Sequence, residues 1–374
     1  MHTPRMLVFG TGVFLRGFLM DFASRAGFKM TLVSSTSAGD DRVDLLRAAN
    51  GVVPLYIRGL DEVGSVVDAK QTLSVVDTAF KASGDFSDVL ATAGDRSISI
   101  VSSNVSESGF KLSDNPSDDM TDAPASFPAR LERWMFARYN ACPDAELNVL
   151  PCELIADNGV RLREMVLSVA SRMARADGFA EWLNTHVAFS DTLVDRICTP
   201  SSNEPLAAVV EPHTFWALKG PVGPSVDRLA DAADGGIVIA PTIENYQLRK
   251  VRLLNGLHTA MAMIAPIKYG ITTVREALEH PDLGSCLEAM LFDELIPSIV
   301  PPVSSDEATA YANLTLRRMR NPFIEHQLAS INVGAPAKWQ TRLLPAITLF
   351  EQRYGRPPAR IVECYALFQS IQAT

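Results

Sequence analysis

The segment from Lys250 to Met261 brings together side chains that can exchange a proton and hold an oxygen: Lys250, Asn255 and His258. With about 100° per residue, the apolar side chains of this segment share one arc of a predicted helix. They are Leu253, Leu254, Leu257, Ala260 and Met261. Lys250 falls in the middle of that arc, whereas Arg252 points away from it. Asn255 and His258 lie beside the arc, at roughly 140° and 80° from Lys250. One helix therefore turns a cation toward the interior.

This arrangement suits proton transfer to an oxygen. Burying an ammonium group is costly, and desolvation lowers the pKa of a lysine toward neutrality. Lys250 could then give or take a proton near neutral pH, while Asn255 and His258 hold a carbonyl or alkoxide oxygen. The residue types leave a structural alternative equally open, in which the lysine pairs with a carboxylate at a domain interface. The carboxylates that could serve are Glu153, Asp195 and Glu211.

A glycine turn lies between the first predicted strand, residues 6–9, and the first predicted helix, residues 13–26. Glycines let the backbone turn tightly and approach a pyrophosphate, and the free N–H groups of a helix N-terminus attract it. Leu15 occupies the third glycine position of the G-x-G-x-x-G pattern, so the fingerprint is imperfect. The context favours dinucleotide binding over a turn that only packs a helix on its strand. The residues assigned to the dinucleotide are Gly10, Gly12, Val13 and Phe14.

The end of the second predicted strand carries Ser34, Ser35 and Thr36 in place of an acid that would bind a ribose 2′-hydroxyl. Asp40 and Asp41 come a few residues later. The sequence therefore indicates NAD without excluding NADP.

Asn104 and Glu107 follow another predicted strand, residues 98–101. In a parallel sheet this is the edge that contacts the ribose and nicotinamide of a dinucleotide. We predict that both residues contact the cofactor. The alternative, polar residues in an ordinary turn, is equally open.

The elements that must position these residues change in character along the chain. Short strands alternate with helices up to residue 243, which predicts a parallel sheet with helices on both faces. From residue 244 the pattern is almost wholly helical, with breaks at prolines. The prediction is an α/β fold: a Rossmann-type NAD(P)-binding domain at residues 1–243, then a mostly α-helical substrate and catalytic domain at residues 244–374. The active site is expected between them.

The predicted elements can be given by residue range. The strands are 6–9, 30–33, 66–67 with 73–76, 98–101, 147–150 and 237–239. The helices of the second domain are 244–266, 272–279, 283–297, 305–319, 323–330 and 340–353. The polar segment 112–124 is expected to be a surface loop, with a lid as one reading.

Composition excludes several classes of protein. The chain has 374 residues, is 47% hydrophobic and carries a net charge of −9, which argues against a nucleic-acid or anionic-membrane partner. No stretch reaches the roughly 18 uncharged apolar residues that span a bilayer. The 5 cysteines are scattered and the 6 histidines dispersed, so neither a disulfide scaffold nor a metal is expected. We expect a cytoplasmic monomer or small homo-oligomer.

Other chemistries find little support. Tyr246 and Lys250 have the spacing of the short-chain dehydrogenase dyad, but Arg16 and Phe18 replace later glycines of that family's N-terminal pattern. The chain has no P-loop and no G-x-S-x-G elbow. A redox reaction with a lysine acid/base and no metal is what the residues favour.

With these motifs in place, the sequence resembles the mannitol dehydrogenase family, the polyol-specific long-chain dehydrogenases and reductases. A lysine, an asparagine five residues on and a histidine three further form the catalytic signature of that family, here Lys250, Asn255 and His258. The resemblance is greatest to members that interconvert tagaturonate and altronate. The matching segments are 9–17, 103–109, 124–131, 150–159, 189–199, 211–220, 248–259, 320–331 and 337–345.

The resemblance implies a metal-independent, NAD(P)-linked carbonyl reduction or alcohol oxidation. It assigns Lys250 as general acid/base, Asn255 and His258 as the groups that bind the reacting oxygen, and Asp195 as the acid that modulates the lysine. Mannitol dehydrogenases carry Asp-Asn where this chain has Glu153-Leu154. The family's second oxygen donor is therefore replaced, and Asn158 is a candidate substitute.

The same resemblance indicates a substrate. A keto sugar acid brings a carboxylate, which needs a cationic partner, and the candidates are Arg320, His326, Lys338 and Arg342. A polyol would need only neutral hydrogen bonds. We predict reversible reduction of tagaturonate to altronate with NAD. The alternatives are a mannitol or polyol 2-dehydrogenase and a fructuronate (mannonate) reductase. Because the chain is shorter than typical members, a catalytically silent nucleotide-binding or interaction protein is a further alternative.

Overall fold

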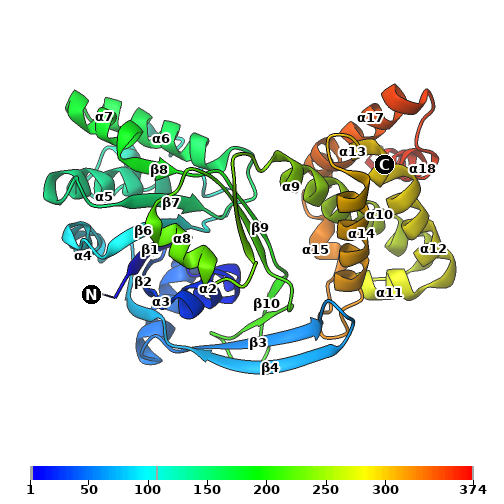
Figure 1. Ribbon diagram of the computed structural model, residues 1–374, viewed down its shortest axis with the longest axis horizontal. Helices are drawn as coiled ribbons and strands as arrows, with labels where there is room; N and C mark the ends of the chain where they lie inside the picture. The colour runs from blue at the N-terminus through cyan, green and yellow to red at the C-terminus, as the bar shows by residue number, and fades with distance from the viewer. Residues whose placement is uncertain (1–2, 107, 373–374) are drawn as a thin grey trace. The chain divides into compact units, whose positions relative to one another are not determined.

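The computed structural model describes residues 3–106 and 108–372, which form two compact units (Figure 1). Unit 1 comprises Met1–Ile57, Asp68–Val210 and Thr214–Ile243. Unit 2 comprises Arg58–Val67, Glu211–His213 and Glu244–Thr374. Two short segments from the first part of the chain, residues 58–67 and 211–213, thus belong with the helices that follow residue 243.

The centre of unit 1 is a 6-stranded sheet with the strand order β5-β2-β1-β6-β7-β8. All neighbouring strands in it are parallel. Counted along the chain within this sheet, the order is third, second, first, fourth, fifth and sixth, which is the order of a Rossmann fold. The predicted Rossmann-type α/β domain is confirmed. The strands are β1 (Arg5–Phe9), β2 (Lys29–Val33), β5 (Val76–Phe80), β6 (Ile98–Ser103), β7 (Leu147–Pro151) and β8 (Val187–Phe189).

Both faces of this sheet are buried, as β1 illustrates. Met6 and Val8 belong to one hydrophobic cluster, whereas Leu7 and Phe9 belong to another, because alternate side chains of a strand point to opposite faces. Helices α2 (Leu19–Ala26), α3 (Ser37–Ala48) and α8 (Pro224–Asp231) contribute to the first cluster. Helices α4 (Phe86–Ala91), α5 (Phe127–Ala141), α6 (Asn158–Arg172) and α7 (Asp177–Thr185) contribute to the second (Figure 1).

Two smaller sheets accompany the central one. Their strand orders are β10-β11-β3-β4 and β13-β12-β9. Of these strands the sequence predicted β13, at 237–239, and the two ends of β4, within 66–67 and 73–76, where the second stretch also includes the start of β5; it did not predict β3 or β9 to β12. The middle of β4 was missed because this strand is exposed along most of its length and shows no apolar alternation. Their strands are β3 (Val53–Leu60), β4 (Val66–Leu73), β9 (Thr192–Asp195), β10 (Cys198–Pro200), β11 (Ala208–Val210), β12 (Phe215–Lys219) and β13 (Ile237–Ala240).

Unit 2 is helical, as predicted, and has its own apolar core. Its helices are α9 (Glu244–Arg249), α10 (Gly256–Tyr269), α11 (Val274–Glu279), α12 (Pro281–Met290), α13 (Ile296–Ile299), α14 (Ser305–Met319), α15 (Leu328–Asn332), α16 (Ala335–Lys338), α17 (Leu344–Tyr354) and α18 (Ala359–Gln372). The sequence did not predict α18. Its buried residues Ile361, Cys364 and Phe368 have helical spacing, so the signal was present.

Helical stretches of unit 2 are interrupted by π-helical segments, at Lys250–Asn255, Leu291–Leu295 and Trp339–Leu343. The continuous α-helices predicted over 244–266, 283–297 and 340–353 are therefore wrong in detail. A π-helix bonds residue i to residue i+5 and uses the same residue types as an α-helix, so apolar spacing does not reveal it. The predicted helix over 323–330 is shorter and later, at α15.

The two short segments of unit 2 are held by buried polar contacts. The Arg318 guanidinium on α14 donates two hydrogen bonds to the Glu211 carboxylate, at 3.0 and 2.8 Å. The side-chain amide of Asn321 donates to the carbonyl oxygen of Arg58 at 2.9 Å. A bidentate arginine–carboxylate pair is geometrically specific, so it fixes residues 211–213 on this helix.

Helix α18 is held at its N-terminus by a carboxylate from elsewhere in unit 2. Glu294 is 3% exposed and accepts hydrogen bonds from the backbone N–H groups of Arg360 and Ile361, each at 2.9 Å. These N–H groups have no partner inside the helix. Glu294 thus supplies the cap that the sequence of α18 lacks.

Replacing Glu294 with alanine should therefore weaken unit 2. We expect Glu294→Ala to lower the free energy of unfolding by about 2 kcal/mol, because buried N–H groups lose their acceptor. Urea unfolding measures this change. The control is Glu288→Ala, which removes the partner of Arg320 in an exposed ion pair and should cost less than about 0.5 kcal/mol. Equal effects of the two variants would contradict the capping role.

Candidate active site

The glycine turn lies where β1 ends, against the loop that follows β6. Gly10 has a φ of +129°, and a Cβ there would lie 2.8 Å from the carbonyl oxygen of Asn104. Such a φ and such a contact both require glycine. The turn and the Asn104 loop are therefore adjacent at the carboxyl edge of the sheet.

Gly12 is not required by packing. The nearest atom to a Cβ at Gly12 would be Oδ1 of Asn104, 3.9 Å away, which is an ordinary contact. A side chain at this position would instead fill the space in front of the turn, where a dinucleotide needs the backbone to come close to its pyrophosphate. The residues present therefore fit a dinucleotide. Val13 and Phe14 begin α1 (Val13–Gly17), and the ring of Phe14 stacks on Phe18 with centroids 4.8 Å apart.

A buried carboxyl group holds the loop after β6. Glu153 is 3% exposed and accepts hydrogen bonds from the Ser103 hydroxyl at 2.9 Å and the Val105 N–H at 2.8 Å. The Asn104 amide donates to the carbonyl oxygen of Cys152 at 3.3 Å. Burial raises the pKa of the Glu153 carboxyl, although both hydrogen bonds favour its charged form. Glu153 thus holds the residues on either side of Asn104, Ser103 through its hydroxyl and Val105 through its backbone N–H. Glu107, the other residue predicted in this loop, lies outside the described residues.

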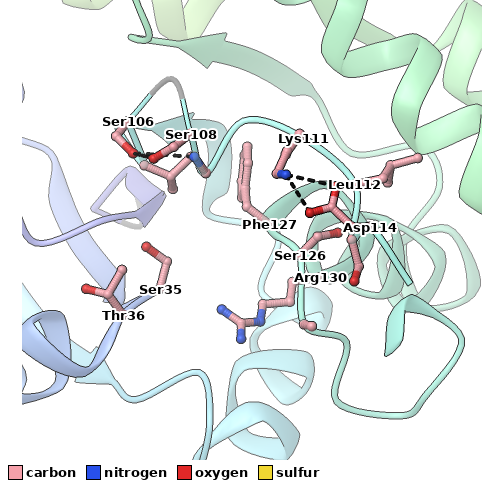
Figure 2. Close-up of a pocket in the computed structure, with 14 residues that line it drawn as sticks. Ser35, Thr36, Ser106, Ser108, Lys111, Leu112, Asp114, Ser126, Phe127 and Arg130 are labelled. Carbon is pink, nitrogen blue, oxygen red and sulfur yellow. Dashed lines mark hydrogen bonds and ion pairs between the residues drawn. The ribbon is translucent and has the colours of Figure 1, made fainter. Parts of the chain in front are cut away.

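A cavity of about 330 Å³ lies beside this edge of the sheet (Figure 2). Ser35 and Thr36 line it from the end of β2, and Val105 lines it from the loop after β6. Phe127 and Arg130 line it from the start of α5. The hydroxyls after β2 were visible in the sequence, whereas Arg130 was not predicted as a site residue, because only the fold brings these distant parts of unit 1 together.

The lysine helix differs from its predicted form in a way that changes the site. Lys250–Asn255 is π-helical, and residues five apart in a π-helix are neighbours along the helix axis, because its hydrogen bonds run from i to i+5. The separation of roughly 140° that an α-helix predicts for Lys250 and Asn255 is therefore wrong. The π-helical segment brings these residues closer in angle. Lys250 and His258 are each 6% exposed, and Asn255 is half-buried.

Other side chains of unit 2 contact this helix. The rings of His258 and His326 meet edge to face with centroids 5.1 Å apart, and burial lowers the pKa of His326. The Thr259 hydroxyl donates to the carbonyl oxygen of Asn255 at 2.8 Å. Nη1 of Arg342 donates to that Thr259 hydroxyl oxygen at 3.3 Å. Arg342 is therefore a cation in contact with the residue next to His258.

The remaining predicted substrate residues have other partners. Asn158 is fully buried, and its amide donates to the carbonyl oxygens of Pro151 and Glu153 and accepts from the Thr192 N–H at 2.8 Å. Its side chain thus braces backbone at the start of α6.

Two of the cations proposed for the substrate carboxylate lie as follows. Arg320 is exposed and forms an ion pair with Glu288. Lys338 is half-buried and donates to the carbonyl oxygen of Ile331 at 2.7 Å.

The carboxylates considered as partners of the lysine have distinct environments. Glu211 is paired with Arg318, and Glu153, which follows β7, accepts a hydrogen bond from the Val105 N–H in the loop after β6. Asp195 is 3% exposed at the end of β9.

Tyr246 has the spacing of the short-chain dehydrogenase dyad with Lys250. Its ring lies 4.7 Å from the guanidinium carbon of Arg249, so the contact observed for this ring is a cation–π contact with an arginine.

Comparison with known proteins agrees with this fold. Residues 4–224 match the mannitol dehydrogenase Rossmann domain, and residues 242–371 match the mannitol dehydrogenase C-terminal domain. The chain is 34% identical to an altronate oxidoreductase of Pectobacterium carotovorum subsp. carotovorum, over 96% of this chain and 77% of that protein. It is 29% identical to an altronate oxidoreductase of Bacillus subtilis, over 96% of this chain and 78% of that protein.

Solved structures share the fold. Substrate-free D-sorbitol dehydrogenase superposes with a TM-score of 0.83 at 20% identity, covering 98% of this chain and 80% of that one. Mannitol 2-dehydrogenase of Pseudomonas fluorescens, in a ternary complex with NAD and D-mannitol, gives a TM-score of 0.78 at 19% identity, covering 97% and 78%.

The fold and these matches define a dehydrogenase or reductase that acts on CH–OH groups. The chain belongs to the mannitol dehydrogenase family. Within residues 3–106 and 108–372, no group of three or more His, Cys, Asp and Glu side chains could hold a metal ion. In the same described part of the chain, no helix has the length and apolarity to cross a membrane.

The raised pKa of Glu153 predicts a pH dependence of stability. The Glu153 carboxyl binds its proton more tightly in the folded chain than in the unfolded chain. The protonated carboxyl therefore contributes its full share of stability below the ordinary carboxyl pKa, and this contribution is lost as pH rises through the raised pKa. Glu153→Gln keeps both hydrogen bonds, because the Ser103 hydroxyl can accept one, and removes the titration. We expect the wild type to lose stability relative to the variant as pH rises from about 4 to 8, as measured by urea unfolding.

The matched control is a carboxyl group whose pKa is shifted in the opposite direction, downward. Arg96 lowers the pKa of the exposed Asp144 to about 2, so its contribution is lost only as pH falls below the ordinary value. The difference in unfolding free energy between Asp144→Asn and the wild type should therefore stay constant between about pH 5 and 8. A flat difference for Glu153→Gln over the same range would contradict a raised pKa at Glu153.

Proposed function

We propose that this protein is an NAD-dependent oxidoreductase that reversibly reduces tagaturonate, a keto sugar acid, to altronate. Residues 1–243 serve as the cofactor domain and residues 244–374 as the substrate and catalytic domain. The observation that carries the proposal is the π-helical segment, which brings Asn255 toward the side of the buried Lys250. The altronate oxidoreductases among the relatives support the substrate.

Unit 1 holds the cofactor. Gly10 and Gly12 admit its pyrophosphate, with Val13 and Phe14 at the start of the following helix, and Asn104 faces it from the loop after β6. When bound, NADH supplies the hydride that the carbonyl carbon of the substrate accepts. Glu153 keeps the Asn104 loop in place through the Val105 N–H.

The lysine helix handles the proton. In the reducing direction Lys250 donates a proton from its ammonium group to the carbonyl oxygen as that oxygen gains charge, and in the oxidising direction its amine takes the proton back. Asn255 and His258 hold the oxygen and stabilise the developing charge. Asp195 is assigned, from the family resemblance, as the acid that modulates Lys250. No metal is required.

A sugar acid also needs a partner for its carboxylate. Arg320 is occupied by an exposed ion pair, Lys338 donates to a backbone carbonyl, and burial favours neutral His326. Arg342 contacts Thr259, next to His258. We therefore assign the carboxylate to Arg342, with His326 beside His258 as a neutral hydrogen-bond partner for substrate hydroxyls.

The alternatives differ in what they require of these residues. A mannitol or polyol 2-dehydrogenase would use the lysine helix without Arg342. A fructuronate reductase would use both and differ only in the stereochemistry that it accepts. A catalytically silent protein would bind the dinucleotide and turn over none of these substrates.

Turnover should depend on Lys250. We expect Lys250→Met, which keeps an apolar side chain of similar length, to lower kcat for tagaturonate about 10²- to 10⁴-fold, the usual contribution of a general acid. NADH absorbance with tagaturonate, fructuronate and fructose measures this. NADH affinity, followed by its fluorescence, should stay unchanged.

The matched control is a lysine on the same stretch of helix. Lys268 on α10 forms an exposed ion pair with Glu363 at 2.6 Å, so Lys268→Met should retain activity within about twofold. Full activity of Lys250→Met would refute the lysine mechanism. Turnover of fructose alone by the wild type would move the protein to the polyol branch.

Arg342 should act on the sugar acid only. We expect Arg342→Gln to raise KM for tagaturonate about tenfold or more, because a charge-assisted hydrogen bond to a carboxylate is lost. KM for any uncharged ketose that the enzyme turns over should change less than about twofold. Arg320→Gln is the control and should change neither. A rise confined to Arg320→Gln would transfer the carboxylate to that arginine.

A further inference from the structure

The cavity beside β2 and β6 has the walls expected of an adenosine site. In a Rossmann fold the ribose of the adenosine lies at the end of the second strand, which here is β2. Val105 and Phe127 give the cavity apolar surface, and Ser35 and Thr36 give it hydroxyl groups (Figure 2). This inference concerns which dinucleotide the proposed enzyme accepts, and so it rests on the proposed function.

Arg130 presents unused hydrogen-bonding capacity to this cavity. Its Nε donates to the carbonyl oxygen of Pro124 at 2.8 Å, and this is its one hydrogen bond among the described residues. The bond anchors the guanidinium and leaves its Nη1 and Nη2 groups available. Figure 2 shows the guanidinium turned toward the side of the cavity where Ser35 and Thr36 lie. Burial lowers the pKa of Arg130, yet an arginine stays charged.

The nearby carboxylates are engaged with other groups. Asp40 accepts hydrogen bonds from the hydroxyls of Ser34 and Ser83. Asp119 is fully buried and accepts from the N–H groups of Ser113 and Ser126 at 2.8 and 2.9 Å. Both attract the Arg130 charge, but neither is its hydrogen-bond partner in the described structure.

One carboxylate among the described lining residues of the cavity is Asp114, which pairs with Lys111 on the exposed rim at 2.8 Å. The end of β2 itself carries hydroxyl groups. An acid at that point would accept a hydrogen bond from a ribose 2′-hydroxyl and repel a phosphate there. The described wall thus lacks the feature that restricts a dinucleotide site to NAD.

We propose that Arg130, together with Ser35 and Thr36, forms a subsite for a phosphate group on the 2′-oxygen of the adenosine ribose. The enzyme therefore uses NADPH as well as NADH. The planar guanidinium donates two parallel hydrogen bonds to phosphate oxygens, and the hydroxyls of Ser35 and Thr36 donate to the same group. Arg130 is thus a specificity-determining residue for the coenzyme.

The test uses the whole protein and a probe that needs no turnover. 2′-AMP and 5′-AMP are titrated by calorimetry, and KM for NADPH and NADH is measured with tagaturonate. We expect 2′-AMP to bind more tightly than 5′-AMP. Arg130→Gln should weaken 2′-AMP and raise KM for NADPH about tenfold or more, while KM for NADH changes less than about twofold. The thermal midpoint of the variant checks that it folds.

Two further variants sharpen the test. Lys111→Gln removes the other cation of this cavity, which is exposed and already paired, and should leave 2′-AMP binding unchanged. Ser35→Asp places an acid at the end of β2 and should reject NADPH while keeping NADH. An equal loss of 2′-AMP binding in Lys111→Gln and Arg130→Gln would overturn the assignment to Arg130.

The outcomes separate this inference from the proposed function. If no sugar acid is turned over but 2′-AMP binds through Arg130, the subsite stands and the proposed function fails. If tagaturonate is reduced with NADH while NADPH is refused and 2′-AMP binds no better than 5′-AMP, the proposed function stands and the subsite is overturned.

Discussion

A parallel sheet that is buried on both faces has room for polar chemistry only where its strands end. β1 meets this condition fully, since Met6 and Val8 pack on one face and Leu7 and Phe9 on the other. A charged or hydrogen-bonding side chain in its middle would lie in apolar surroundings and pay the cost of desolvation. Because the strands are parallel, their carboxyl ends, and the loops that follow them, lie at one edge of the sheet. Gly10, Asn104 and Glu153 all lie at that edge for this reason.

The helical unit meets a different constraint. A helix satisfies its own backbone, so a buried polar side chain can occur at any turn that faces the interior, and its direction depends on the helical period alone. The π-helical segment at Lys250–Asn255 alters that period locally. It changes the relative direction of Lys250 and Asn255 without breaking the helix. At the end of this segment the Thr259 hydroxyl donates a hydrogen bond to the carbonyl oxygen of Asn255. The carbonyl group thus has a side-chain donor as its partner.

These constraints explain what the sequence could predict. The strands β1, β2, β6 and β7 of the central sheet are short, mostly apolar stretches with buried side chains, so they were predictable. The apolar arc around Lys250 was visible for the same reason, because burial follows residue type. Strand β4 was only partly found, since it is mostly exposed. The π-helical segment was not predictable, because α- and π-helices draw on the same residues and differ in one hydrogen-bond step.

The cavity shows a second limit of sequence. Ser35 and Arg130 lie far apart along the chain. They line the same cavity only because the fold places the end of β2, the loop after β6 and the start of α5 next to one another. What distinguishes a binding group there is its remaining hydrogen-bond capacity, which residue type does not give. Asn158 and Asp119 are polar and buried near the same sheet, but backbone groups engage both. They therefore stabilise loops. Arg130 has one anchoring bond and a free pair of parallel donors in the described structure, so its side chain is positioned before any ligand arrives. A side chain that is already fixed in place loses little conformational entropy when it binds a ligand. An arginine on an exposed rim is free to move, so it loses more entropy on binding and makes a weaker phosphate site.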